Sequence, residues 1–420
     1  MLTASARARA VLALAPALLA GCITTRSTVV RETRPGREYD ALYPRSIEVC
    51  ATSQINPLFA GAGGPAGLAV LYLKGVCRDT AAAYPRVKLC DPATTDLSDP
   101  ESGTGVTVDR VLRNVNWLAV PGEKLFFYGE VGRYELLDRG RLDAAVNEAE
   151  ARGVFRGVEI HPEDMPPGPP EAARHEAQIN HFLGTDFALS YGRSAYCVRF
   201  PVPEAALART VAYLDGLNDA YATGRREYRW SGVFDNCSHV LHNGLAAAGF
   251  WSPQSVNVFI LLQAFNLSIP VDQFSRASFI ADAWLENPKA IYDNADFRRL
   301  LLAEGWLPFG HGVLFRVVPV HQRNAMYDTK LTFFSLTDLL GQRSRQVAEL
   351  IADARFTDLE MNLLSFQKRY ETLLAGRDRR RFDEPEEDEV YELFRAAYFA
   401  WAERQLEDAK AKLAALYGGR

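Results

Sequence analysis

The chain has 420 residues, 48% of them hydrophobic and 24% charged, a balance typical of globular proteins that bury a core. These values argue against wholesale disorder, a collagen-like repeat and a multi-span membrane protein. The 47 Lys and Arg against 52 Asp and Glu give a net charge of -5. Because duplex-binding domains normally carry a basic surplus, we expect no nucleic-acid partner.

The first segment has the pattern of a secretory signal. A start with basic but no acidic residues precedes an apolar run at 11–20, which is shorter than the ~20 residues that a membrane-spanning helix needs. The run ends in Leu-Ala-Gly-Cys at 19–22, which resembles the bacterial lipobox. The resemblance implies diacylation of Cys22 and attachment to a membrane facing the periplasm, and Ile23 in place of an aspartate favours the outer membrane. The alternative is an ordinary cleaved signal with a cysteine nearby.

Hydrophobic patterns between residues 45 and 325 predict a mixture of strands and helices. Apolar runs predict strands at 68–73, 106–111, 117–128 (broken at Pro121-Gly122), 154–160, 187–200 and 312–320. Helical spacing and good helix formers predict helices at 138–152, 172–182, 203–223 and 236–248. The proline-rich stretch 162–170 indicates a loop. Helices dominate after Ser335, and an apolar stripe from Val390 to Trp401 follows helical spacing.

Cysteine counting leaves one thiol over. Without Cys22, five cysteines remain in a compartment that oxidises thiols, so at least one stays unpaired within the chain. Cys77 and Cys90 could close a small loop, and Cys50 with Cys197 could close a long one, although the sequence does not fix the connectivity. Cys237 is the candidate for the leftover thiol, either buried or kept for its reactivity.

The segment around Cys237 has the features of a nucleophile site. Asp235 or Asn236 suits a helix cap directly ahead of Cys237, and the partial positive charge of a helix N-terminus favours a thiolate. Thiol hydrolases need this geometry together with a histidine as general base. The alternative is a buried cysteine that faces the core from an ordinary helix.

This pattern resembles the NlpC-type papain-like superfamily, especially its circularly permuted branch. The residues that carry the resemblance are the strand 195–201, the helix 204–221, Tyr228 and Asn236-Cys237. In that branch an earlier strand carries Gly-His, and here Gly67-Leu68 aligns with it and places a leucine at the position of the base. The resemblance implies an α+β fold with a papain-like core, a mostly antiparallel sheet and a cysteine-bearing helix, followed by a helical C-terminal extension.

Another histidine could supply the base. In the unpermuted order the histidine follows the cysteine, and His311 lies 74 residues after Cys237, with His321 ten residues further. His161, at the end of the predicted strand 154–160, is the second candidate. His239 and His242 share a helix face but offer only two ligands, so they predict a metal site weakly. No phosphate loop or paired-cysteine zinc motif occurs, and we expect no cofactor.

Two functional hypotheses follow. The first is a membrane-anchored cysteine hydrolase or acyltransferase with Cys237 as nucleophile and His311 or His161 as base, which the resemblance directs to peptidoglycan peptides or lipid acyl groups. The second is a catalytically degenerate envelope lipoprotein with a binding or structural role and a possible protein partner at its C-terminal helices. The expected divisions are a signal peptide at 1–21, a tether at 22–44, a papain-like domain at 45–325 and a helical extension at 326–420.

Overall fold

The computed structural model is an α+β fold built on one six-stranded antiparallel sheet. It describes residues 37–52, 67–132, 134–224, 226–232, 235–253, 270–281, 285–322, 342–377 and 389–418. The strands follow the order β6-β5-β2-β1-β7-β8. Their bounds are Ser46–Thr52 for β1, Ala69–Lys74 for β2, Gly103–Thr107 for β5, Leu118–Pro121 for β6, Ala195–Pro201 for β7 and Leu314–Val318 for β8. A separate hairpin pairs β3 (Val76–Arg78) with β4 (Val87–Leu89).

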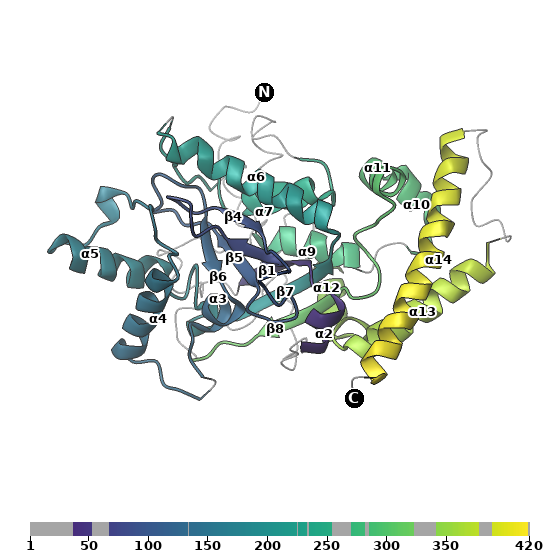
Figure 1. Cartoon of the computed structure of the whole chain (residues 1–420), viewed down its shortest axis with the longest axis horizontal. Helices are drawn as coiled ribbons and strands as arrows, with labels where there is room; N and C mark the ends of the chain where they lie inside the picture. Colours follow the sequence, from purple (N-terminus) through teal and green to yellow (C-terminus); the bar gives the residue numbers. More distant parts are fainter. Residues whose placement is uncertain are drawn as a thin grey trace, which may run out of the picture.

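Helices cover both faces of the sheet (Figure 1). On one face lie α6 (Glu204–Ala222), α7 (Cys237–Ala248) and α9 (Pro270–Ala281), and on the other lie α2 (Arg37–Leu42) and α3 (Glu123–Tyr128). The close approach of α3 depends on Gly105, since a Cβ there would meet the ring of Phe126 at 2.1 Å. Helix α7 packs against Leu71 of β2 at Gly244, where a Cβ would meet the leucine side chain at 3.4 Å, an ordinary van der Waals contact.

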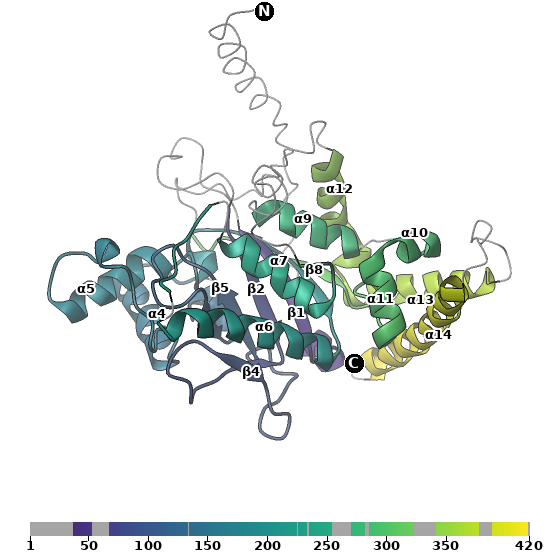
Figure 2. The ribbon, with the colours of Figure 1, turned by 90° about the horizontal axis from the view of Figure 1, so that it is seen from above.

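The remaining helices gather at the two ends of the sheet (Figure 2). Helices α4 (Arg139–Ala151) and α5 (Pro170–Ala177) lie at one end, with a π-helical turn at Gln178–Phe182. The other end holds α10 (Pro288–Asp293), α11 (Ala295–Glu304), α13 (Leu359–Ala375) and α14 (Glu389–Gly418), and α12 (Gln342–Ala352) packs on α9. Short 3-10 turns occupy Pro162–Asp164, Leu189–Tyr191 and Ala354–Phe356.

Two disulfides confirm the pairing suggested by the cysteine spacing. Cys50 and Cys197 lie opposite each other on β1 and β7 and are joined across the sheet, and Cys77 is joined to Cys90 beside the small hairpin. Cys237 is free and buried. The oxidising compartment expected from the sequence suits this arrangement, because disulfides persist there and are rare in the cytosol.

Most predicted elements are confirmed, two are wrong, and two strands are confirmed only in part. Of 106–111 only residues 106–107 belong to β5, and of 187–200 only residues 195–200 belong to β7, after a 3-10 turn at Leu189–Tyr191. Of the predicted strand pair 117–128, only Leu118–Pro121 is a strand, and Glu123–Tyr128 forms α3 after Gly122, whose φ of 86° ends the strand. Residues 154–160 form turns, with Gly153 and Gly157 at positive φ, and only Ile160 makes a β-bridge. Within the expected tether, Arg37–Leu42 forms α2, whose Tyr39 and Asp40 are buried.

A buried charge network joins the sheet to α2 and α3. Glu48 of β1 accepts hydrogen bonds from Arg199 of β7 at 3.1 Å and from Arg316 of β8 at 2.8 Å. The guanidinium of Arg199 also reaches Asp40 of α2 at 2.9 Å, and that of Arg316 reaches Glu123 of α3 at 2.8 Å. Lys74 of β2 lies 3.9 Å from Asp40, so the three acids and three bases of this network neutralise one another, as buried charges must.

Candidate functional site

Helix α7 begins at Cys237 because Asn236 caps it. The backbone of Asn236 is extended, and its side-chain oxygen accepts a hydrogen bond from the N–H of Ser238 at 2.9 Å. The N–H of Asn236 in turn donates to Nδ1 of His239 at 3.3 Å, which completes a reciprocal cap. The other end stops at Gly249 with a φ of 106°. The predicted helix and its cap are therefore confirmed, and the cap fixes where the thiol lies.

The Cys237 thiol is buried against the start of β2. The N–H groups of Ala69 and Ser238 donate to its sulfur, and only 7% of the residue is exposed. Burial raises the pKa of the Cys237 thiol to about 11 and outweighs these two hydrogen bonds, which act in the opposite direction. The thiol is therefore protonated at neutral pH, and a protonated thiol is a weak nucleophile.

Leu68 precedes the residue whose N–H contacts the thiol. The hydrogen bond from Ala69 to the Cys237 sulfur brings the thiol next to β2, which begins directly after Leu68. Leu68 is 8% exposed, and its own N–H donates to the Thr52 hydroxyl at 3.2 Å on β1. A leucine side chain has no atom that accepts a proton, so this neighbour supplies no base.

A pair of buried acids acts on the thiol through its charge, since Asp186 raises the pKa of Cys237. Asp186 follows the π-helical turn at Gln178–Phe182 and accepts a hydrogen bond from the Thr107 hydroxyl at the end of β5. Asp109, two residues beyond β5, accepts one from the N–H of Val111 at 2.8 Å. Burial, and then the charge and hydrogen bond of Asp109, raise the pKa of Asp186 well above its usual range. The two carboxyls therefore share a proton, as closely spaced buried acids do.

This acid pair predicts an unusual pH dependence. Because the pKa of Asp186 is raised, the folded state holds a proton that the unfolded state releases, so this group costs stability as pH rises above about 3.9. Asp186→Asn keeps the hydrogen bonds of the protonated form. Its advantage over the wild type should grow with pH by up to about 1.4 kcal/mol per unit. Urea denaturation of both proteins at pH 4, 6 and 8 measures the trend, and a constant difference across that range contradicts the shared proton.

His161 lies in the same buried region but is held by backbone groups. Its Nε2 donates to the Tyr228 carbonyl at 3.0 Å, and its N–H donates to the Val111 carbonyl at 2.9 Å. Burial, and then the nearby charges of Asp235 and Cys237, raise the pKa of Tyr228, so the phenol and the thiol share one environment. All seven histidines belong to the described residues, and none hydrogen-bonds to the Cys237 sulfur.

His311 lies at a different place in the fold. It precedes β8, the edge strand three positions from β2, and strands about 4.8 Å apart put roughly 14 Å between those positions. Its Nδ1 accepts a hydrogen bond from the Tyr43 hydroxyl at 2.6 Å, and its Nε2 lies 3.2 Å from the Asp408 carboxylate of α14. The structure therefore brings His311 to the C-terminal helices and not to Cys237.

The histidines of α7 do not converge on a metal. His239 takes part in the helix cap, while His242 contacts Gln273 at 2.9 Å and stacks on Trp251. In the part of the chain that the structure describes, the one group of three potential ligands contains Glu48, and its two cysteines form the disulfide across the sheet.

The acid pair had no signal in the sequence, because Asp109 and Asp186 are far apart in the chain and only the fold brings them together.

No protein-family model matches this chain, and neither does any curated protein or any solved structure. None of the described helices has the length and hydropathy to cross a bilayer. Cys22 lies outside the described residues.

Proposed function

We propose that this chain is a lipid-anchored envelope protein with a papain-like core that no longer performs cysteine catalysis and has a binding or structural role. The anchor is Cys22 of the lipobox-like segment, which attaches the protein to the periplasmic side of a membrane, the outer membrane by its Ile23. The observation that carries the loss of catalysis is the environment of the Cys237 thiol, which is buried beside Leu68 and makes no hydrogen bond to a histidine.

The thiol pKa quantifies this argument. With a pKa of about 11, about one Cys237 thiol in ten thousand is ionised at pH 7, against a few per cent for an ordinary cysteine. Thiol hydrolases reverse this ratio by placing an imidazolium or a helix N-terminus beside the sulfur. Here Asn236 supplies the helix start, but burial has the largest effect on the pKa of the Cys237 thiol and raises it. Leu68 occupies the position where the resemblance would place the general base.

The C-terminal helices support the binding role. The outward faces of α13 and α14 expose several large apolar side chains, Met361, Leu364 and Leu393, of which Leu393 is 59% exposed. We take these exposed apolar side chains as the surface that a protein partner would contact.

The second candidate is a cysteine hydrolase or acyltransferase that acts on peptidoglycan peptides or lipid acyl groups. The observation in its favour is the acid pair, because Asp109 and Asp186 together carry a carboxylate close to the thiol. In this mechanism the pair would take the thiol proton as the sulfur attacks a carbonyl carbon, and would give it to the amine or alcohol that leaves when the C–N or C–O bond breaks. The resulting thioester would be hydrolysed by water, or its acyl group would pass to an acceptor, and either step would regenerate the thiol.

Thiol labelling distinguishes the two candidates. The detergent-solubilised full-length protein is treated with iodoacetamide at graded pH, and mass spectrometry locates the label. We expect Cys237 to stay unmodified in the folded protein up to pH 8.5 and to react after denaturation, because the thiol is buried and protonated. Labelling of Cys237 at pH 7 with an apparent pKa below about 8.5 supports the enzyme instead. The same spectra report whether Cys22 carries a diacyl group.

Two variants calibrate the labelling experiment. Ala205→Cys places a thiol in the first turn of α6 at an exposed position, so it should react at neutral pH and shows what an accessible helix-start thiol does. Leu68→His restores a base at the aligned position and should raise the labelling rate of Cys237 at pH 7. A rate that stays at zero in this variant assigns the protection to burial alone.

A further inference from the structure

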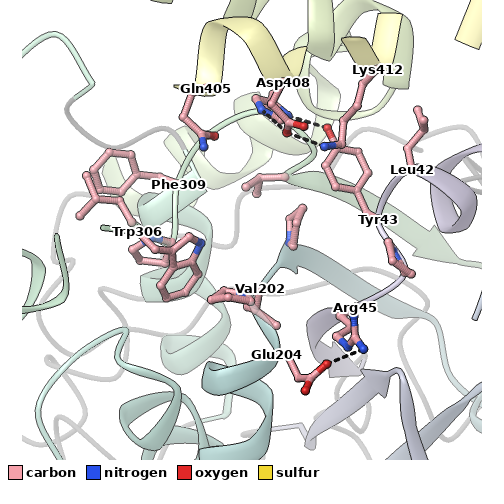
Figure 3. A pocket seen from close by; sticks show the side chains of 18 residues that line it. Leu42, Tyr43, Arg45, Val202, Glu204, Trp306, Phe309, Gln405, Asp408 and Lys412 are labelled. Carbon is pink, nitrogen blue, oxygen red and sulfur yellow. Dashed lines mark hydrogen bonds and ion pairs between the residues drawn. The ribbon is translucent and has the colours of Figure 1, made fainter. Parts of the chain in front are cut away.

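A cavity lies between the sheet core and the C-terminal helices, away from Cys237. Its volume is about 270 Å³, just under the range of ~300–1,000 Å³ that small-molecule sites usually occupy. Four segments line it: Leu42–Arg45 after α2, Pro201–Glu204 before α6, residues 306–313 before β8, and one face of α14 (Figure 3).

The walls of the cavity are apolar and stiff. Four prolines line it, and Trp306, Phe309 and Val202 provide further apolar surface. Proline has a fixed φ and no N–H group, so these walls offer little hydrogen bonding and change shape little. Such walls suit an apolar group of a ligand and leave its polar groups to the charged side chains.

Two ion pairs supply the charges at opposite ends of the cavity, with Trp306 and Phe309 along one side (Figure 3). At one end Arg45 meets Glu204 at 2.6 Å, and at the other Lys412 pairs with Asp408. The carboxylates are the more open partners, with side-chain exposures of 59% for Glu204 and 45% for Asp408, against 24% and 16% for the two cations.

The Asp408 end is held in place from behind. His311, 6% exposed, lies between the Tyr43 hydroxyl and the Asp408 carboxylate, and Lys412 sits 4.9 Å from the centre of the Tyr43 ring. Burial alone would raise the pKa of Asp408, but the hydrogen bonds from His311 and Lys412 outweigh it and hold the pKa at about 2. This carboxylate is therefore ionised at every physiological pH.

We propose that this cavity binds a small zwitterion with an apolar side chain, an amino acid or dipeptide in size. Its ammonium group would meet the Glu204 carboxylate at one end, its carboxylate would reach Lys412 at the other, and its apolar side chain would lie against Trp306 and the prolines. The charges agree with a neutral ligand of this kind, because the two cations and two carboxylates cancel. This site is independent of the proposed loss of catalysis at Cys237.

Titration calorimetry on the detergent-solubilised full-length protein tests the proposal. The probes are glycyl-L-leucine, L-leucinamide, which lacks the carboxylate, N-acetyl-L-leucine, which lacks the ammonium, and methyl glucoside, a neutral sugar that could stack on Trp306. We expect glycyl-L-leucine to bind with a Kd below about 1 mM and the other three at least tenfold more weakly.

Variants at both ends of the cavity connect the binding to this site. Lys412→Met and Glu204→Gln should each weaken the binding of glycyl-L-leucine at least tenfold. Lys410→Met is the matched control, because Lys410 lies on the same helix, pairs with Glu407 at 3.4 Å and does not line the cavity. Thermal denaturation shows which variants remain folded. The proposal is overturned if the dipeptide does not bind at millimolar concentration, if the sugar or either capped probe binds equally well, or if the control loses as much affinity as the cavity variants.

Discussion

Replacing Cys50 and Cys197 together with alanine should lower the free energy of unfolding by roughly 5 kcal/mol, and replacing Cys77 and Cys90 by about 3 kcal/mol. The difference arises because the two bonds close loops of very different length, with sequence separations of 147 and 13. A longer loop loses more conformational freedom in the unfolded chain when it is closed.

Urea denaturation of both double variants and the wild type under non-reducing conditions measures these losses. Each double variant leaves an even number of cysteines paired, so Cys237 remains the single thiol of the described residues in all three proteins. Equal losses in the two variants contradict the loop-length account. They would mean that local packing at each bond decides its contribution.

Glu48→Gln should cost about 3–5 kcal/mol, because it removes the charge that two buried guanidinium groups share. Glu48 is fully buried between Arg199 and Arg316 and accepts hydrogen bonds from both. The glutamine keeps the size of the side chain, so the loss reports charge and hydrogen bonding and not a cavity. After the change, the three cations Arg199, Arg316 and Lys74 face only two acids, Asp40 and Glu123.

Glu204→Gln is the matched control for this prediction. Glu204 also pairs with an arginine, Arg45 at 2.6 Å, but its side chain is 59% exposed, and exposed pairs contribute at most about 1 kcal/mol. Midpoints of urea denaturation at pH 7 compare the two variants. A Glu48→Gln loss as small as that of the control shows that water reaches the network and screens its charges.

Helix ends were predictable because their signals are local. Asn236 and Gly249 mark α7 within a few residues of chain, and Asp138 marks the start of α4 in the same way. The two wrong strand predictions also rested on local sequence preferences. Aromatic and β-branched residues favour strands in isolation, but Gly122, Gly153 and Gly157 turn the backbone, and the fold then packs these segments as a helix and turns.

Only part of the candidate site could be predicted from the sequence. Cys237 and its cap follow from neighbouring residues, whereas the surroundings of the thiol depend on the order of strands. His311 lies at a suitable distance along the chain, but its strand β8 pairs with β7 at the sheet edge and not with β2. The Asp109–Asp186 pair needs a contact between β5 and the segment after the π-helical turn, and no spacing rule in the sequence reports such a contact.

The contacts of α2 tie the two ends of the described chain together. The Tyr39 hydroxyl donates to the Gly312 carbonyl at 2.7 Å, and Tyr43 connects through His311 to Asp408 on α14. A pull on the chain from its N-terminal side would therefore be transmitted to the segment just before the edge strand β8 and, through His311, to α14. The segment of α2 and Tyr43 is thus a mechanical connection between the first and the last described helix.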